Sequence, residues 1–158
     1  MISTGLLAGA FAYTFFAVLP TFDEVPLAVH LAYRNALMRH NGIYVQGLMA
    51  LSIVMPLWWS FTIRGSENLR LLASLASLSS LTSFLVTRFG NVPINRLMRS
   101  WPAASPPHGY QDLLQRWAVY HNIRFATAAA AFVLVVLAQT VFRTNSLAEY
   151  STSRPASS

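Results

Sequence analysis

Two clusters of polar side chains interrupt an otherwise apolar sequence. Imidazole is the side chain best suited to exchange protons near neutral pH, so His121 is the candidate acid–base group. Because unpaired polar groups are costly in an apolar setting, their grouping indicates a site. The clusters consist of Arg88, Asn91 and Asn95 in the first, and of Trp117, Tyr120, His121 and Arg124 in the second.

The spacing within each cluster is helical. The polar residues of the first cluster stand at i, i+3 and i+7, which is one face if the helix continues through Pro93. Trp117, His121 and Arg124 stand at i, i+4 and i+7, again on one face. One cluster follows an apolar stretch and the other opens the next, so the two are expected to converge at one end of a bundle. The same end is predicted to hold His30, Arg34 and His40.

Each cluster also has a purely structural interpretation. The string Asn-Val-Pro-Ile-Asn could cap and turn the chain at a helix end, where Asn is favoured. Trp101 and Trp117 could belong to an interfacial aromatic belt, and Arg124 could extend toward lipid headgroups. The residues alone leave these interpretations open.

The elements that position these side chains are predicted to be membrane helices. Of 158 residues, 54% are hydrophobic and 10% charged, and the mean hydropathy is +0.45. A soluble domain carries about 25% charged residues, so this chain has too few to coat a water-facing surface. Four apolar stretches, at about 3–22, 42–63, 70–88 and 124–142, are each long enough to cross a hydrocarbon core.

We therefore predict an all-α fold, a multi-pass integral membrane four-helix bundle with a long polar connection between its third and fourth helices. A single domain is expected over residues 1–150, followed by a disordered Ser/Thr/Pro-rich tail over 151–158. The serines of the third stretch predict close helix packing. Whether such small residues face the bundle interior or a second copy of the chain is open, so a homo-oligomer is an alternative.

The composition excludes several kinds of site. The chain has no Cys, which excludes disulfides, zinc–thiolate sites, iron–sulfur clusters and cysteine nucleophiles. Its basic residues are all Arg and are scattered between apolar stretches, so no nucleic-acid partner is expected. No two of the four His are spaced i, i+4, so no metal site is predicted. A metal held by histidines through distant contacts stays an alternative.

The polar motifs, taken in order, resemble those of the anthrone oxygenases. These are small four-span membrane proteins that include the noranthrone monooxygenases of aromatic polyketide pathways. The opening helix is also similar, from Gly9 through Phe11 and Phe16 to Pro20, and the resemblance covers about residues 5–142. The motifs are Gly90-Asn-Val-Pro-Ile-Asn95, then Trp101, then Trp117-x-x-x-His121-Asn122-x-Arg124 entering the last apolar stretch.

The resemblance implies an oxygenase of an aromatic, polyketide-type substrate. An anthrone is a flat tricyclic phenol whose central CH2 is acidic, and its carbanion reacts with O2 directly to give a quinone. The implied partners are a hydrophobic aromatic small molecule, O2 and the lipid bilayer. No cofactor is expected.

The resemblance also suggests roles for individual residues. His121 would remove the acidic proton as a general base. The hydrogen-bond donors to the enolate and peri-hydroxyl oxygens would be Asn91, Asn95 and Arg124. The side chains expected to bind the substrate are Trp117, Tyr120, Arg34, His40 and Arg88.

Two other functions are compatible with these residues. A cofactor-free cyclase or isomerase of a polyketide-like substrate would use the same base and oxyanion donors. A non-catalytic membrane partner subunit would turn its Arg and Asn toward another protein. Oxygen consumption separates the oxygenase from the cyclase or isomerase.

Overall fold

Helices make up most of the described part of the protein. The computed structural model describes the backbone of residues 1–102 and 106–153, and the side chains of that part as far as residue 145. Long apolar segments become helices because a helix pairs its own backbone N–H and C=O groups where no water is present. In chain order the elements are α1 (Ile2–Tyr13), η1 (Thr14–Val18), α2 (Leu19–Glu24), α3 (Leu27–Thr62), α4 (Glu67–Val86), η2 (Thr87–Asn91), α5 (Val92–Arg99) and α6 (Tyr110–Ser153).

Four helical segments are long and apolar enough to cross a membrane, and no strand occurs in the described ranges. The predicted all-α, four-helix architecture is therefore confirmed. Each segment combines consecutive elements or is a single long helix. Their bounds are Ile2–Glu24, Leu27–Thr62, Glu67–Arg99 and Tyr110–Asn145.

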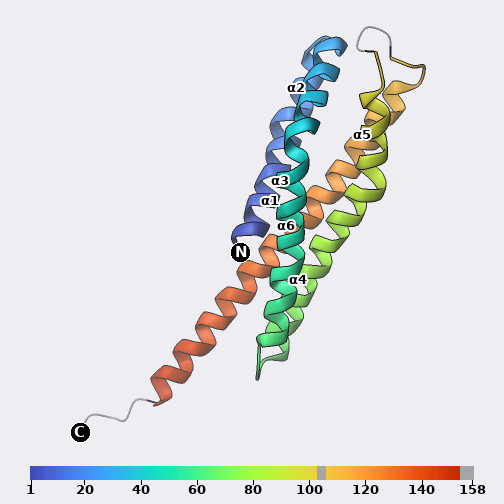
Figure 1. Ribbon diagram of the computed structural model, residues 1–158. Helices are drawn as coiled ribbons and strands as arrows, with labels where there is room; N and C mark the ends of the chain where they lie inside the picture. Colours follow the sequence, from blue (N-terminus) through green and yellow to red (C-terminus); the bar gives the residue numbers. More distant parts are fainter. Residues whose placement is uncertain (103–105, 154–158) are drawn as a thin grey trace.

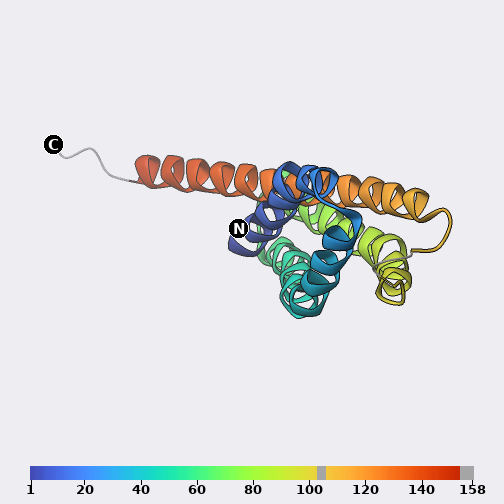
Figure 2. The same ribbon diagram turned by 90° about the horizontal axis from the view of Figure 1, so that it is seen from above.

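The four segments pack side by side around two clusters of buried apolar side chains. In Figure 1, α1, α3, α4 and α6 run along one another, and each packs on two others: α1 on α3 and α6, and α4 on α3 and α6. Seen from above, α6 lies along one side of the other helices (Figure 2). Its C-terminal part extends beyond the rest of the bundle (Figure 1).

The helices extend well beyond the predicted spans. The polar segment 88–124, predicted as a long connection, is helical over residues 88–99 and 110–124, because several of its polar side chains bond to one another where the helices meet. Residues 27–41 form the first part of α3, in keeping with apolar positions that recur at helical spacing. Helix α6 continues to Ser153, so the first three residues of the predicted disordered tail are helical. Residues 154–158 lie outside the described part.

Serine side chains tie α4 to both of its neighbours. Ser77 Oγ donates to the Ile53 carbonyl of α3 at 2.9 Å, and Ser83 Oγ donates to the Arg124 carbonyl of α6 at 3.0 Å. Small side chains let helix backbones approach closely, and their hydroxyls then bond across the contact. The predicted packing role of the serines is confirmed at these two positions.

Two π-helical turns precede two prolines. The Leu19 N–H bonds to the Thr14 carbonyl and the Val92 N–H bonds to the Thr87 carbonyl, each five residues back. Pro20 and Pro93 follow directly. Inside an α-helix the proline ring clashes with the carbonyl four residues earlier, and a widened turn relieves that clash. This is why the third segment continues through Pro93 to Arg99 instead of ending there.

The second π turn brings η2 against α6. Gly90 lies in this turn, and a Cβ atom built on it would stand 2.7 Å from Cγ of Tyr120 and 2.9 Å from Cδ1 and Cδ2. Those atoms belong to the base of the ring, which cannot move aside without moving the α6 backbone. Gly90 therefore sets how closely the two polar clusters approach each other.

We expect Gly90→Ala to destabilise the fold by about 1–3 kcal/mol, because the added methyl group overlaps Tyr120. Gly47→Ala is the matched control, since it lies within α3 and nothing stands within 4 Å of its added Cβ. Thermal unfolding of the detergent-purified variants measures both, and Gly90→Ala/Tyr120→Ala should recover part of the loss. Equal melting temperatures for the two single variants would contradict the contact.

Candidate functional site

The two polar clusters meet around Trp117. The indole Nε1 of Trp117 donates to Asn95 Oδ1 at 2.7 Å, and Asn91 Nδ2 donates to the Trp117 carbonyl at 3.0 Å. An indole can only donate and a carbonyl can only accept, so these bonds determine which way each amide faces. Both asparagines thereby hold one residue of α6 against η2 and α5. Trp117 is 8% exposed and also packs on Ile94 and Met98.

His121 is completely enclosed and both of its ring nitrogens are occupied. Arg124 donates to Nδ1 through Nε at 3.0 Å and through Nη2 at 2.8 Å. The Nε2 atom lies 3.2 Å from the Phe11 carbonyl of α1. A guanidinium has only donors, so Nδ1 must be the unprotonated nitrogen and Nε2 must carry the hydrogen. The imidazole is therefore neutral in this arrangement, and its lone pair points at a cation.

A second histidine–arginine pair, His30 and Arg34, has a similar arrangement on α3. Arg34 Nε donates to His30 Nε2 at 3.1 Å, both residues lie on α3, and both are buried. The His30 ring stacks on Phe22 of α2, with 4.1 Å between ring centroids and 7° between ring planes. Here too the nitrogen facing the guanidinium is the acceptor, so His30 is neutral with its hydrogen on Nδ1.

Aromatic faces surround both guanidinium groups. The Arg34 Cζ lies 4.2 Å and the Arg124 Cζ 5.2 Å from the Trp117 ring centroid. Phe22 lies 5.0 Å from Arg34, and Phe11 lies 4.5 Å from Arg124. The imidazole of His121 stacks parallel to Trp117, with 5.4 Å between centroids. The electron-rich ring faces stabilise the cations where water is excluded.

No carboxylate neutralises these charges. Among the described residues, neither Arg34 nor Arg124 forms an ion pair. The Nη1 atom of Arg34 is buried without a hydrogen-bond partner, and so is Oδ1 of Asn91. No group of three or more His, Asp or Glu side chains that could hold a metal ion occurs in the described part. The site therefore has an excess of positive charge and an unused donor on Arg34, which suit an anionic ligand.

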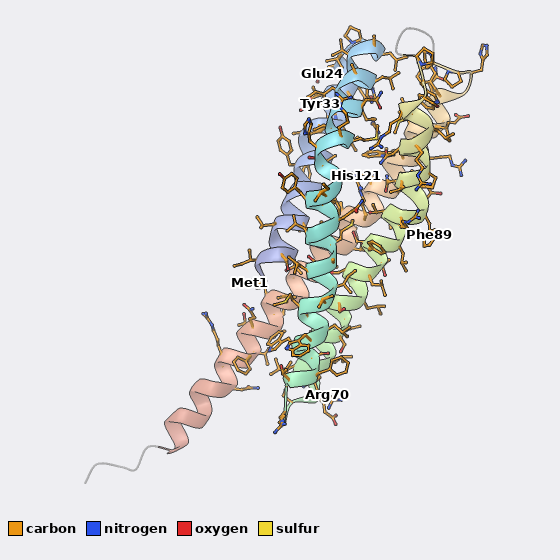
Figure 3. The ribbon with its side chains drawn as sticks, viewed as in Figure 1. Met1, Glu24, Tyr33, Arg70, Phe89 and His121 are labelled. Carbon is orange, nitrogen blue, oxygen red and sulfur yellow. The ribbon has the colours of Figure 1, made fainter. Side chains whose placement is uncertain are left out.

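A cleft of about 540 Å³ reaches this cluster from the end of the bundle formed by α2, the start of α3 and the start of α6. Pockets for small organic ligands range from about 300 to 1,000 Å³. Figure 3 shows that His121 lies inside the bundle, nearer the end that carries Glu24 and Tyr33 than the end that carries Arg70. His30 and Arg34 are the members of the cluster that line the cleft, together with Leu19, Phe22, Asp23, Val25, Leu27, Gln111, Leu114, Gln115 and Ala118.

The structure brings together most of the predicted site residues. Asn91, Asn95, Trp117, His121, Arg124 and Arg34 form one connected cluster. Tyr120 packs on Gly90 beside it. Two predicted residues lie apart, because Arg88 and His40 are exposed and no hydrogen bond, ion pair or ring contact joins them to the cluster.

The predicted set of site residues did not include His30, Phe11 and Phe22. His30 stands four residues before Arg34, a helical spacing that could have indicated the pair. The sequence did not indicate the two phenylalanines. Phe11 contributes its backbone carbonyl to His121 and its ring face to Arg124, and Phe22 contributes only a ring face to Arg34.

The family model described as anthrone oxygenase matches residues 35–134, which is more than half of the chain. The chain belongs to the anthrone oxygenase family. No curated protein and no solved structure is significantly similar to it.

Membership of the anthrone oxygenase family supports a polyketide-related oxygenase at the level of the family. The matched segment includes the asparagines of η2 and α5 and the pair His121–Arg124. The pair His30–Arg34 precedes it, on the first turns of α3.

We expect Asn95→Leu to cost about 1–3 kcal/mol of stability, because it leaves the buried indole N–H of Trp117 without an acceptor. In a double-mutant cycle with Trp117→Phe, which removes the donor, the losses should be less than additive by about 1 kcal/mol. Asn122→Leu, an exposed change on α6, is the control and should be additive with Trp117→Phe. Strict additivity for Asn95 would show that this hydrogen bond contributes nothing.

Proposed function

We propose that the protein is a multi-pass membrane oxygenase that converts an anthrone-type CH2 group into a quinone carbonyl. The observation that carries the proposal is the His121–Arg124 pair. It places a neutral imidazole lone pair and a cation without a carboxylate partner beside each other in a water-excluded bundle. Such a pair offers a proton acceptor and a stabiliser for the oxyanion that forms when the proton leaves.

The proposed reaction begins when the acidic C–H bond of the substrate loses its proton to His121 Nδ1. In the arrangement described above, Arg124 occupies that nitrogen, so Arg124 first transfers its hydrogen bonds to the substrate oxygen. The guanidinium then faces the developing enolate while the imidazole accepts the proton. Binding of the oxyanion and release of the base are thereby coupled through one side chain.

The enolate then transfers one electron to O2, and the resulting radicals couple to form a C–O bond. The peroxide anion takes the proton back from His121. Loss of water breaks the O–O bond and the remaining C–H bond, and leaves the quinone carbonyl. The substrate supplies all the electrons that reduce O2, so we propose that no resident cofactor takes part.

The other cluster residues have supporting roles in this proposal. Asn91 and Asn95 hold Trp117 through the bonds described above, so they act as positioning residues rather than as direct donors to the substrate. Trp117 and Tyr120 supply aromatic surface for a flat substrate. A membrane bundle suits this chemistry, because both O2 and an apolar tricyclic substrate partition into lipid.

We expect the detergent-purified protein to consume O2 and form anthraquinone when it is given a simple anthrone, at a rate above the spontaneous one. Because the proposed chemistry needs no metal, a strong chelator should leave the rate unchanged. Loss of uptake on chelation, restored by one metal, would move the reaction to a metal site. Absence of catalysed uptake would overturn the oxygenase and favour a cyclase or a partner subunit.

Two variants test the pair itself. His121→Asn should lower kcat about 10²–10⁴-fold by removing the proton acceptor. Arg124→Gln should lower it about 10²–10³-fold by removing the cation that stabilises the enolate. His108→Asn, an exposed change between α5 and α6, is the matched control and should retain full activity. A His121→Asn protein that folds and turns over at the normal rate would sink the base assignment, and His30→Asn would then be the next variant.

A further inference from the structure

The cleft between α2, α3 and α6 is electrically polarised from one end to the other. Three of its lining residues are almost fully buried and form its inner end: Phe22 at 8% exposed, His30 at 7% and Arg34 at 5%. Asp23, Gln111 and Gln115 also line it but are exposed, so they form its mouth. Apolar side chains of α2 and α6 also line the cleft, among them Leu19 and Leu114.

The inner end carries a cation with donors to spare. The only hydrogen bond of Arg34 in the described part of the chain uses Nε, so neither terminal amino group has a partner. Apart from His30, the guanidinium faces the rings of Phe22 and Trp117. Buried cations are normally paired, because removing a charge from water costs more than ring faces alone return. A negatively charged oxygen of a ligand would pair with the free amino groups of Arg34.

The mouth carries the opposite charge. Among the described residues that line the cleft, Asp23 is the one carboxylate, and the neighbouring Glu24 is not one of them. A ligand that occupies the whole cleft therefore meets a cation at its inner end and an anion at its outer end. Placing an anionic group of the ligand beside Asp23 would cost free energy, so the cleft selects the orientation of the ligand as well as its shape.

We propose that this cleft binds the flat aromatic substrate in one orientation, with an ionised phenolic oxygen on Arg34 and an uncharged ring edge toward Asp23. The inference rests on the proposed oxygenase function, because it says how the substrate class of that reaction is held beside the His121–Arg124 pair; Arg34 and Arg124 both face the ring of Trp117. It assigns Arg34 as the residue that binds an ionised phenolic oxygen, while the enolate oxygen faces Arg124. It assigns Asp23 as the residue that rejects substrates with a carboxylate on the outer ring.

The first test uses a peri-dihydroxyanthraquinone, which resembles the product, has no CH2 group to oxidise and turns from yellow to red when a phenol ionises. A nearby cation lowers the pKa of a bound phenol. The purified full-length protein should therefore bind the probe in its red form at a pH where the free probe is yellow. Arg34→Gln should abolish the colour change and weaken binding about tenfold or more. Arg39→Gln, an exposed arginine on the same helix, is the control and should do neither.

The second test uses the same probe with a carboxylate on the ring edge remote from the hydroxyls. The unmodified protein should bind it more weakly than the first probe. Asp23→Asn should strengthen its binding about tenfold and change binding of the first probe less than about twofold. Glu24→Gln is the adjacent control and should change neither. Because Asp23 is exposed, this variant keeps the proposal testable if Arg34→Gln fails to fold.

The outcomes separate this inference from the proposed function. An Arg34-dependent colour change without any O2 uptake would support the cleft and overturn the oxygenase. Normal uptake with a colour change that persists in Arg34→Gln would support the oxygenase and overturn the cleft. Equal binding of the two probes by the unmodified protein would overturn the role of Asp23.

Discussion

The structure depends on keeping two guanidinium groups in an apolar bundle without a carboxylate. Each is held by one imidazole on its own helix and by the faces of aromatic rings, and Trp117 serves both. Desolvation makes such charges costly, so every neighbour must be positioned closely. The asparagine bonds to Trp117 and the contact of Gly90 with Tyr120 meet this demand, because they hold α6 against the third helical segment.

The helical architecture was predictable because the hydrocarbon core imposes both length and hydrophobicity on a spanning helix. The convergence of the two polar clusters was predictable too, since helical spacing puts Trp117, His121 and Arg124 on one face. The continuation of the third segment past Pro93 was not, because hydropathy does not report a π turn. Likewise, the exposure of Arg88 and His40 depends on helix rotation, which polar residues at a helix end do not determine.

The π turns connect local backbone irregularity to the position of the site. Both lie against α6, η1 through the α1–α2 segment and η2 through the α4–α5 segment. A π turn shifts the helical phase of everything that follows it, and such turns are frequent at functional sites. Phe22 follows the first turn and Asn95 follows the second, so the extra residue in each turn affects which side chain faces Arg34 and which one holds Trp117.

The hydrogen bond between His121 Nε2 and the carbonyl of residue 11 has a consequence for how the site tolerates substitution. Every amino acid supplies the same carbonyl, so the acceptor for the Nε2 hydrogen of His121 depends on the path of the first helix and not on the side chain at position 11, while Arg124 fills Nδ1 from its own helix. Replacing Phe11 would remove a ring face from Arg124 but leave the imidazole proton where it is. The first helix thus contributes to the acid–base chemistry through its backbone, a contribution that side-chain substitution at that position cannot remove.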